Sequence, residues 1–303
     1  MESSSLLIVG AGGLGCRWAR GAHSRISAES DLMLVDADMD SFKGASQAHC
    51  MHLDPTGMEK GTAALPALAA HRTITAIPEI ADVLDSAELV IILTGLGGGT
   101  GTGSTLELAR SAKRKGAIVV VVAGLPFAEQ SFRSRMASDA LPSLEEAVDV
   151  CIRVSLERLA WQSRSRRMDW QQGSGWVEEL VEGLISTIGK LGKINLDLMD
   201  LKTIVCKEGM STMLVGIGDN QTPRQILESA TRAPLAEFDV KGAKGCLLQI
   251  EGGTDMTISQ VDELANLFTK KLDDDAQVIL GARVSPDLAG QLRVVCVLSG
   301  IQA

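Results

Sequence analysis

The residues with the clearest chemical potential form a glycine and threonine run, GLGGGTGTGS, at positions 95–104. An apolar segment, 89–93, precedes this run, and a segment of helical composition, 105–115, follows it. Glycines let the backbone turn sharply and bring its N–H groups close to an anion. The N-terminus of a following helix adds partial positive charge, and threonine hydroxyls add donors. The run therefore predicts a phosphate-binding loop between a buried strand and a helix, rather than a flexible linker.

A second glycine segment, at 10–15, has the spacing GxGxxG and directly follows the apolar segment 6–9. Asp36 ends the next expected strand, about 20 residues further on, where dinucleotide-binding folds place an acid for a ribose hydroxyl. Taken alone, this pattern favours an NAD-dependent oxidoreductase. Two glycine segments at strand ends instead suit one mononucleotide whose phosphates are bound from both sides. We keep the oxidoreductase as the less favoured alternative.

Alternating strands and helices are expected to position both glycine segments. In the first half, apolar runs predict strands at 6–9, 32–35, 89–93, 117–123 and 148–154, with helical segments between them. Strands that alternate with helices form a mostly parallel sheet with helices on both faces. The predicted fold class is α/β, with a Rossmann-like, parallel-sheet nucleotide-binding domain, a central helix and a second, smaller α/β domain.

A second series of predicted strands begins after residue 203. Apolar runs predict strands there at 213–217, 245–250, 277–281 and 292–299. Segment 176–191 has apolar residues at helical spacing and predicts a long helix between two domains. We expect a nucleotide-binding domain at 1–168, a central helix with its following loop at 169–200, and a C-terminal α/β domain at 201–303.

Two segments give weaker signals. Residues 41–73 show no clear periodicity and are expected to be irregular. The basic segment 153–167 is interpreted as a solvated turn, and a contact with an anion or a partner is the alternative.

Composition restricts the class of protein. The formal net charge of -9 argues against a nucleic-acid binder held by a basic face. Six scattered cysteines without a CxxC pair indicate reduced thiols and a cytoplasmic protein. His49 and His52 flank Cys50, but without a second ligand cluster we expect no metal site there. No apolar run of about 18 residues and no signal-peptide pattern is present, so we expect no direct membrane segment.

These motifs together resemble the tubulin/FtsZ superfamily, and FtsZ most closely. GGGTGTG at 97–103 is similar to the tubulin signature, and the triplet 36–38 lies where FtsZ has an Asn-Thr-Asp loop. Pro126-Phe127, with Glu129 and Arg133, resembles the ribose loop, one residue shorter before the glutamate.

The resemblance continues into the second half. Asn195, Asp197 and Asp200 resemble the Asn-x-Asp-x-x-Asp synergy loop that follows the central helix of FtsZ. Segments 242–245 and 250–253 resemble strand edges of its C-terminal domain.

The resemblance implies a GTPase of the prokaryotic division machinery that polymerises head to tail, with GTP or GDP as ligand and Mg²⁺ assisting. The partners implied are other copies of the chain and division-machinery proteins. In that family the synergy loop of one subunit completes the active site of the next, which makes Asn195, Asp197 and Asp200 catalytic. The nucleotide-contacting residues implied are Gly12, Gly13, Gly15, Cys16, Asp38, Gly97, Gly98, Gly99, Thr100, Gly101, Thr102, Gly103, Glu129, Arg133 and Trp170.

The chemistry of the acids is consistent with this role. Hydrolysis of a phosphoanhydride depends mainly on positioning and charge stabilisation. Asp197 and Asp200, three residues apart, lie on one face of a helical first turn, where they can orient an attacking water. Asn195 can hold that water or a phosphate oxygen. The structural alternative is a helix cap with acids favoured by the helix dipole. A head-to-tail contact is heterologous and generates open filaments.

The sequence also departs from the family pattern. Cys16 stands where FtsZ has an asparagine, and the acid that reads guanine, expected about five residues after Trp170, falls at Gly175, with Asp169 nearby. We therefore expect weaker guanine selectivity. Segment 52–61 replaces the γ-phosphate-sensing loop. We also expect no C-terminal peptide of the kind that FtsZ uses to reach membrane adaptors. A nucleotide-binding scaffold or regulator with little hydrolysis is the alternative function.

Overall fold

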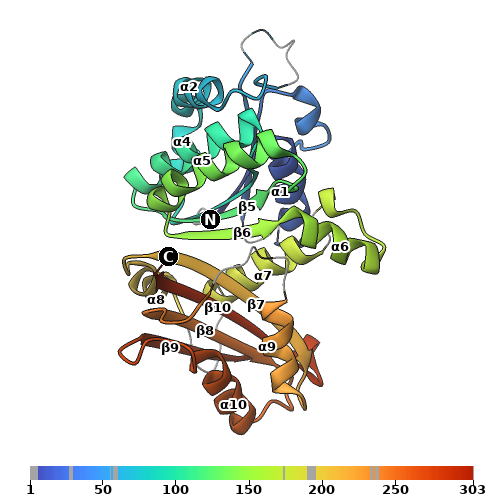
Figure 1. Cartoon of the computed structure of the whole chain (residues 1–303), viewed down its shortest axis with the longest axis vertical. Helices are drawn as coiled ribbons and strands as arrows, with labels where there is room; N and C mark the ends of the chain where they lie inside the picture. Colours follow the sequence, from blue (N-terminus) through green and yellow to red (C-terminus); the bar gives the residue numbers. More distant parts are fainter. Residues whose placement is uncertain are drawn as a thin grey trace. The chain divides into compact units, whose positions relative to one another are not determined.

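The computed structural model describes residues 6–26, 30–54, 56, 61–172, 175–189, 196–232, 235 and 239–302. The chain forms two compact units, Met1–Glu178 and Glu179–Ala303 (Figure 1). The predicted boundaries at 168 and 200 stay predictions. The second unit begins within the helix that the sequence predicts at 176–191.

The first unit is built on a six-stranded parallel sheet with the order β3-β2-β1-β4-β5-β6. Its strands are β1 (Leu6–Ala11), β2 (Asp31–Asp36), β3 (His49–His52), β4 (Leu89–Gly95), β5 (Ile118–Leu125) and β6 (Val150–Ser155). Its α-helices are α1 (Gly12–Ile26), α2 (Pro66–Ala76), α3 (Ala81–Asp85), α4 (Gly99–Arg114), α5 (Ser131–Ala147) and α6 (Leu156–Arg166). Short 3-10 helices are η1 (Met39–Phe42), η2 (Ile77–Ile80) and η3 (Trp170–Gln172). The predicted Rossmann-like architecture is confirmed.

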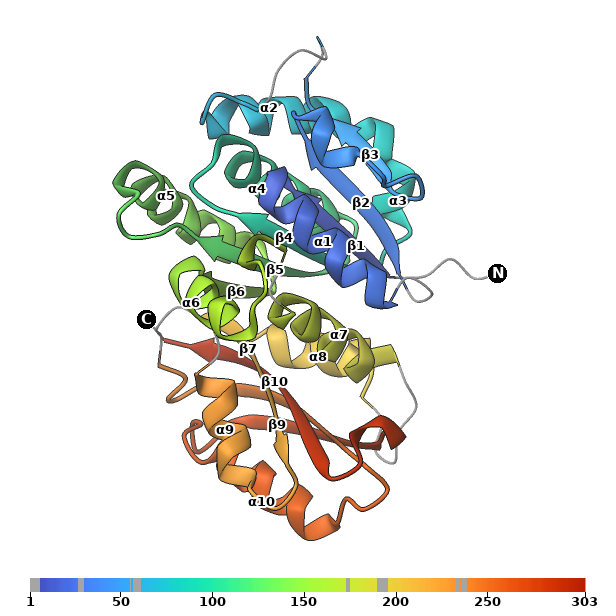
Figure 2. The ribbon, with the colours of Figure 1, turned by 90° about the vertical axis from the view of Figure 1, so that its right-hand side faces the viewer.

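The central strands are apolar along their whole length because helices cover both faces of the sheet. Leu7 and Val9 of β1 pack with Val90 and Ile92 of β4 in one hydrophobic cluster that includes residues of α4 and α5. Side chains alternate along a strand, so Ile8, fully buried, faces the opposite side. Figure 2 looks onto that opposite side, which α1 covers. Connections between parallel strands are right-handed. The chain runs from β1 to β2 in one direction across the sheet and from β4 to β5 in the other, so α1 and α4 lie on opposite faces.

The second unit contains a four-stranded sheet with the order β7-β10-β8-β9. Strand β10 (Gln291–Ile301) is antiparallel to β7 (Met210–Asp219) and β8 (Gly245–Gly252), and β9 (Gln277–Val284) is parallel to β8. The helices are α7 (Trp176–Gly189), which begins in the first unit, α8 (Leu198–Val205), α9 (Pro223–Thr231) and α10 (Ile258–Thr269), with the 3-10 helix η4 (Pro286–Leu288). Together they form the second, smaller α/β domain that the sequence predicts.

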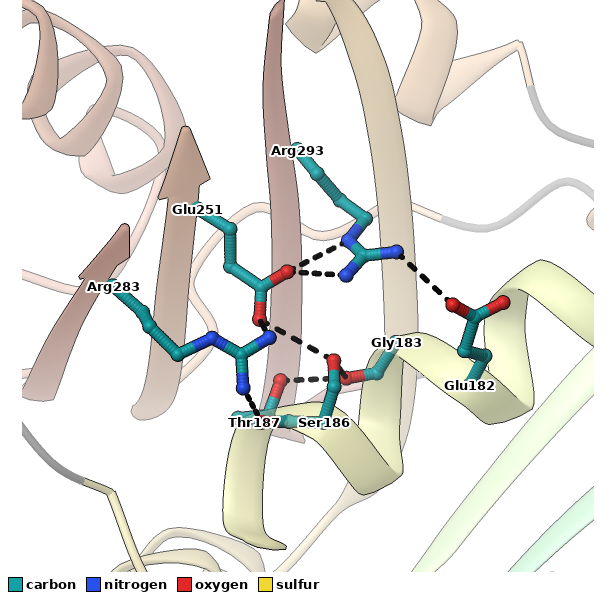
Figure 3. A network of polar contacts seen from close by, with 7 residues as sticks. All are labelled: Glu182, Gly183, Ser186, Thr187, Glu251, Arg283 and Arg293. Carbon is teal, nitrogen blue, oxygen red and sulfur yellow. Dashed lines mark hydrogen bonds and ion pairs between the residues drawn. The ribbon is translucent and has the colours of Figure 1, made fainter. Parts of the chain in front are cut away.

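A buried ionic network attaches α7 to this sheet (Figure 3). Glu251 of β8 is fully buried and forms ion pairs with Arg283 of β9 and Arg293 of β10. From α7, the Ser186 hydroxyl donates to Glu251 Oε1 at 3.3 Å, and Arg283 Nη1 donates to the Ser186 carbonyl at 2.8 Å. Arg293 also reaches Glu182 of α7 at 3.7 Å. Ion pairs and hydrogen bonds thus connect helix α7 with strands β8, β9 and β10 in one network.

Two predictions about local structure were wrong. Segment 41–73, expected to be irregular, contains β3 and α2. Neither element has a clear apolar pattern in the sequence. Only Met51 is buried among the four residues of β3, and the buried face of α2 consists of Ala69, Thr73 and Ala76. The basic segment interpreted as a turn contains the end of β6 and helix α6, whose N-cap Ser155 accepts a hydrogen bond from the Arg158 N–H at 3.3 Å.

In the parts of the chain that are described, no helix combines the length and the apolar composition needed to cross a membrane.

Candidate nucleotide-binding site

The candidate site lies at the carboxyl ends of β1 and β4. These two strands are neighbours in the sheet, but the chain leaves them in opposite directions: β1 is followed by β2 on one side of the pair, and β4 by β5 on the other. Such a reversal of strand order opens a crevice between the connections, and ligands of open α/β sheets bind there. A cavity of about 1220 Å³ occupies this place in the first unit, lined by the connections that follow β1, β2, β4 and β5, by residues before α2, and by η3.

The glycine and threonine run divides into a short turn and the first turns of α4. Gly95 ends β4, and Gly98 is the N-cap of α4, which begins at Gly99, so residues 99–104 are helical and the loop spans only 96–98. A Cβ on Gly103 would collide with the Pro66 carbonyl of α2, and one on Gly101 with the Gly95 carbonyl. The run is therefore rich in glycine partly because α4 packs closely against other backbone.

Only part of the run faces the cavity. Gly98, Gly99, Thr100 and Gly101 line it, and Gly97, Thr102 and Gly103 do not. The Gly97 N–H donates to Thr102 Oγ1 at 2.9 Å, and Gly97 has a φ of +84°, so this pair shapes the turn.

The first glycine segment meets the second across the cavity floor. Gly12 and Gly13 line the cavity at the start of α1. Gly15 does not line the cavity. It packs closely against β4, where a Cβ would collide with the Leu93 carbonyl. Cys16 also lies outside the cavity: it is buried, and its Sγ donates to the Gly10 carbonyl at 3.4 Å. Burial raises the pKa of the Cys16 thiol, so it stays protonated.

Two aromatic side chains form another part of the wall. Trp170 of η3 and Phe127, which follows β5, line the cavity with their ring centroids 5.3 Å apart and their planes at 77°. Trp18 Nε1 of α1 donates to the Trp170 carbonyl at 3.3 Å and fixes η3 against α1. An exposed aromatic face in a nucleotide-sized cavity can stack on a base.

The acids of the cavity are already engaged with their own surroundings. Asp36 accepts hydrogen bonds from the Ala37 N–H at 2.8 Å and the Ser41 hydroxyl at 2.5 Å. Burial raises the pKa of Asp36, and these hydrogen bonds partly oppose that rise. Asp38 accepts from the Asp40 N–H at 3.0 Å and caps η1.

The cavity's arginines are not engaged in this way. Arg17 and Arg20 of α1 and Arg133 of α5 line the cavity, and none of their side chains forms a hydrogen bond or ion pair with any residue that the structure describes. The cavity therefore offers cationic donors to an anion. Glu129, predicted beside Arg133 at the ribose, is exposed and does not line the cavity.

The predicted catalytic acids lie in the second unit. Asp197 is the N-cap of α8, and its Oδ1 accepts from the Met199 and Asp200 N–H groups at 2.8 and 3.0 Å. Asp200 Oδ2 accepts from the Asp197 N–H at 2.9 Å and completes a capping box. Asp197 Oδ2 and Asp200 Oδ1 have no partner within the described ranges. Asn195 lies outside the described residues.

Sequence reasoning missed Arg17, Arg20, Thr62 and Gln130, all of which line the cavity. Helical periodicity was the signal for the first two, since Arg17 and Arg20 follow Gly13 by four and seven residues. Thr62 lies in the segment expected to be irregular, where its Oγ1 lies 3.3 Å from Thr100 Oγ1, within hydrogen-bonding distance.

A parallel sheet with glycine segments after both switch-point strands defines a nucleotide-binding α/β protein. Sequence profiles match the Tubulin/FtsZ family GTPase domain over residues 5–161 and the FtsZ family C-terminal domain over residues 209–302. The chain belongs to the tubulin/FtsZ family and carries its GTPase domain. This assignment replaces the NAD-dependent oxidoreductase considered as an alternative.

Individual relatives agree with the assignment. Cell division protein FtsZ 2 of Haloferax volcanii is 31% identical over 303 residues, which cover 98% of this chain and 76% of the relative. Cell division protein FtsZ of Haloferax mediterranei is 29% identical and covers 99% and 81%. The structure of an FtsZ dimer from M. jannaschii superimposes with a TM-score of 0.83 at 25% identity, covering 99% of this chain and 89% of that one.

Proposed function

We propose that the chain binds GTP and GDP in the cavity, assembles head to tail with other copies, and hydrolyses GTP where Asp197 and Asp200 of one subunit meet the nucleotide of the next. The observation that carries the proposal is the pair Gly13 and Gly98. Both line the cavity, neither has a positive φ, and a Cβ on Gly98 would meet nothing within 4 Å. On Gly13 it would make only ordinary contacts of 3.7 Å or more. The fold requires glycine at neither position, so a closely approaching ligand explains both.

The residues of the cavity suit the parts of a nucleotide. Backbone N–H groups at the start of α1 and α4 suit phosphates, because helix N-termini carry partial positive charge. Trp170 and Phe127 suit the base. Magnesium in nucleotide sites uses one or two carboxylates together with phosphates. Asp38 and Asp40 line the cavity and could supply them, although the described residues contain no group of three or more metal-binding side chains.

Hydrolysis is proposed to use acids from a neighbouring subunit. Asp36 uses both carboxylate oxygens in local hydrogen bonds, and Asp38 and Asp40 are the acids proposed for Mg²⁺. Asp197 and Asp200, at the exposed start of α8, each keep one oxygen without a partner among the described residues. Bound GTP supplies the phosphoanhydride, and the acids of the neighbouring subunit orient the attacking water and accept its proton. The active site is therefore formed by two chains. Turnover then depends on assembly.

The relatives support self-assembly and a division role. The Haloferax relatives are named cell division proteins, and the M. jannaschii structure is an FtsZ dimer. By extension, division-machinery proteins are proposed as further partners of this chain.

A scaffold with little hydrolysis is a second candidate, because the capping box holds both acids in a purely structural arrangement. The test measures GTP turnover per subunit against protein concentration, with light scattering as the assembly readout. Turnover that rises with concentration supports the assembling GTPase. Turnover near zero, with filaments present, favours the scaffold. A flat, finite rate while filaments form contradicts hydrolysis shared between subunits.

A further inference from the structure

Arg17 is a cation in the cavity wall without a counterion. It lies one helical turn after Gly13, and its Nη1 is 3.8 Å from the position that a Cβ on Gly13 would occupy. Its Nε is buried and has no hydrogen-bond partner, and within the described parts of the chain its side chain forms no ion pair. An unpaired, partly buried charge is costly, so a site that keeps one is prepared for an opposite charge.

Asp36, the carboxylate beside the same Cβ position, does not fill this need. Its Oδ2 lies 3.7 Å from the Cβ position on Gly13. Its hydrogen bonds go to Ser41 and to the Ala37 N–H, and it forms no ion pair with Arg17. Both Arg17 and Gly13 line the cavity, so the guanidinium lies beside Gly13 without a carboxylate partner among the described residues.

The geometry of α1 brings this cation back toward the start of the helix. Arg17 follows Gly13 by about 6 Å along the helix axis, and long helical side chains point toward the N-terminus. Arg20, one turn further, instead approaches the segment after η1, where its Nη2 lies 3.4 Å from a Cβ position on Gly44. Among the arginines of α1 that line the cavity, Arg17 is thus the one aimed at the glycine segment.

We propose that Arg17 is a phosphate-binding residue that donates a charge-assisted hydrogen bond to the nucleotide phosphate nearest Gly13. This inference rests on the proposed nucleotide-binding function and adds a side-chain cation to the backbone N–H groups at the start of α1. Because the protein then neutralises part of the phosphate charge itself, nucleotide binding keeps a contribution that does not depend on a divalent cation.

The test compares Arg17→Gln and Arg17→Met with the wild-type chain, using calorimetry with GDP and with guanosine, in buffer containing EDTA and again with Mg²⁺. Arg114→Gln is the matched control, because it removes the same charge from the exposed last turn of α4, away from the cavity. Arg17→Lys keeps the charge and loses the planar fork. Thermal unfolding without nucleotide checks that the neutral variants fold, which is expected because Arg17 forms no hydrogen bond or ion pair with a described residue.

We expect GDP affinity to fall about 10- to 100-fold in both neutral variants, the range for a hydrogen bond between charged groups. Guanosine affinity and the Arg114→Gln variant should change by less than about threefold, and Arg17→Lys should be intermediate. Unchanged GDP affinity in the neutral variants overturns the inference and leaves the proposed function standing. An equal loss for guanosine also overturns it, since the contact is then with the nucleoside. A wild-type chain that binds neither compound overturns both proposals.

Discussion

Gly12 and Gly101 belong to different strand–helix connections, but a Cβ on Gly12 would lie 2.9 Å from the backbone nitrogen of Gly101. Gly12 also has a φ of +73°, which disfavours any other residue. The two glycine segments are therefore in direct backbone contact at the point where the strand order reverses. The fold needs this pair of glycines even without a ligand, and that separates them from Gly13 and Gly98.

Gly98→Val is expected to fold normally and to lose nucleotide binding. A Cβ on Gly98 meets nothing within 4 Å apart from its chain neighbours, and Gly98 lines the cavity, so the valine side chain is expected to enter the space where phosphates are proposed to lie. Gly12→Ala is the contrasting variant. It should lose about 1–3 kcal/mol of unfolding free energy with no nucleotide present, because its backbone is strained. Thermal unfolding and GDP calorimetry of both variants check the difference, and full GDP affinity in Gly98→Val would contradict it.

Asp197→Asn and Asp200→Asn are expected to keep stability and nucleotide binding and to lose about 10²–10⁴ in turnover. Asparagine retains the oxygen that caps α8 and removes the negative charge, so these variants separate catalysis from capping. Asp197→Ala loses the cap as well and should cost about 1 kcal/mol of stability.

Steady-state turnover at a filament-forming concentration, together with denaturant unfolding, makes this comparison. If the asparagine variants turn over GTP at the wild-type rate, the acids are structural and the capping box is their whole role.

Glu251→Gln is expected to lower the free energy of unfolding by about 3–5 kcal/mol, because it leaves Arg283 and Arg293 without their buried counter-charge. Asp85→Asn is the control: Asp85 pairs with Lys115 at 2.8 Å, but both side chains are nearly half exposed. An exposed pair of this kind is worth about 0–1 kcal/mol. Chemical denaturation of both variants provides the measurement, and equal losses would show that the network's burial has no special cost.

The fold was predictable where burial left a simple pattern. Strands β1, β4 and β5 of the first sheet are apolar on both faces, so each gives a short, continuous apolar run. The two glycine segments and their position after strands were also readable. Edge strand β3 and the alanine-rich α2 were not, because neither buries a row of large side chains.

The site was predictable in outline but not in its inner geometry. Glycine is a poor helix former, so the sequence favours a loop at 99–103, whereas close packing against α2 and β4 makes it helical. Arg17 was missed because only the helical turn of α1 brings its side chain back to Gly13, four residues earlier in the sequence. Cys16, predicted at the nucleotide, is instead held inside by the Gly10 and Val35 carbonyls.

The two positions considered for a guanine-reading acid, Asp169 and Gly175, do not line the cavity. Gly175, at the position expected for the guanine-reading acid, has no side chain to offer, and its φ of +77° lies in the left-handed region that glycine favours. The Asp169 carboxylate accepts from the Gln171 N–H at 3.0 Å and caps η3. Stacking on Trp170 remains as the main contact proposed for the base.

We therefore expect the preference for GTP over ATP to be below about 10³-fold, or roughly 4 kcal/mol. A site that hydrogen-bonds a substrate edge rejects analogues strongly because its own polar groups are left unpaired, whereas stacking accepts every base. Trp170→Ala should weaken GTP and ATP by the same factor, since stacking is worth about 1–3 kcal/mol for any base. Competition binding of the two nucleotides to wild-type and Trp170→Ala protein, with Mg²⁺ present, measures both quantities. A wild-type preference above 10³-fold, or a Trp170→Ala loss confined to GTP, would mean that another residue reads the guanine edge and that Trp170 positions the base for it.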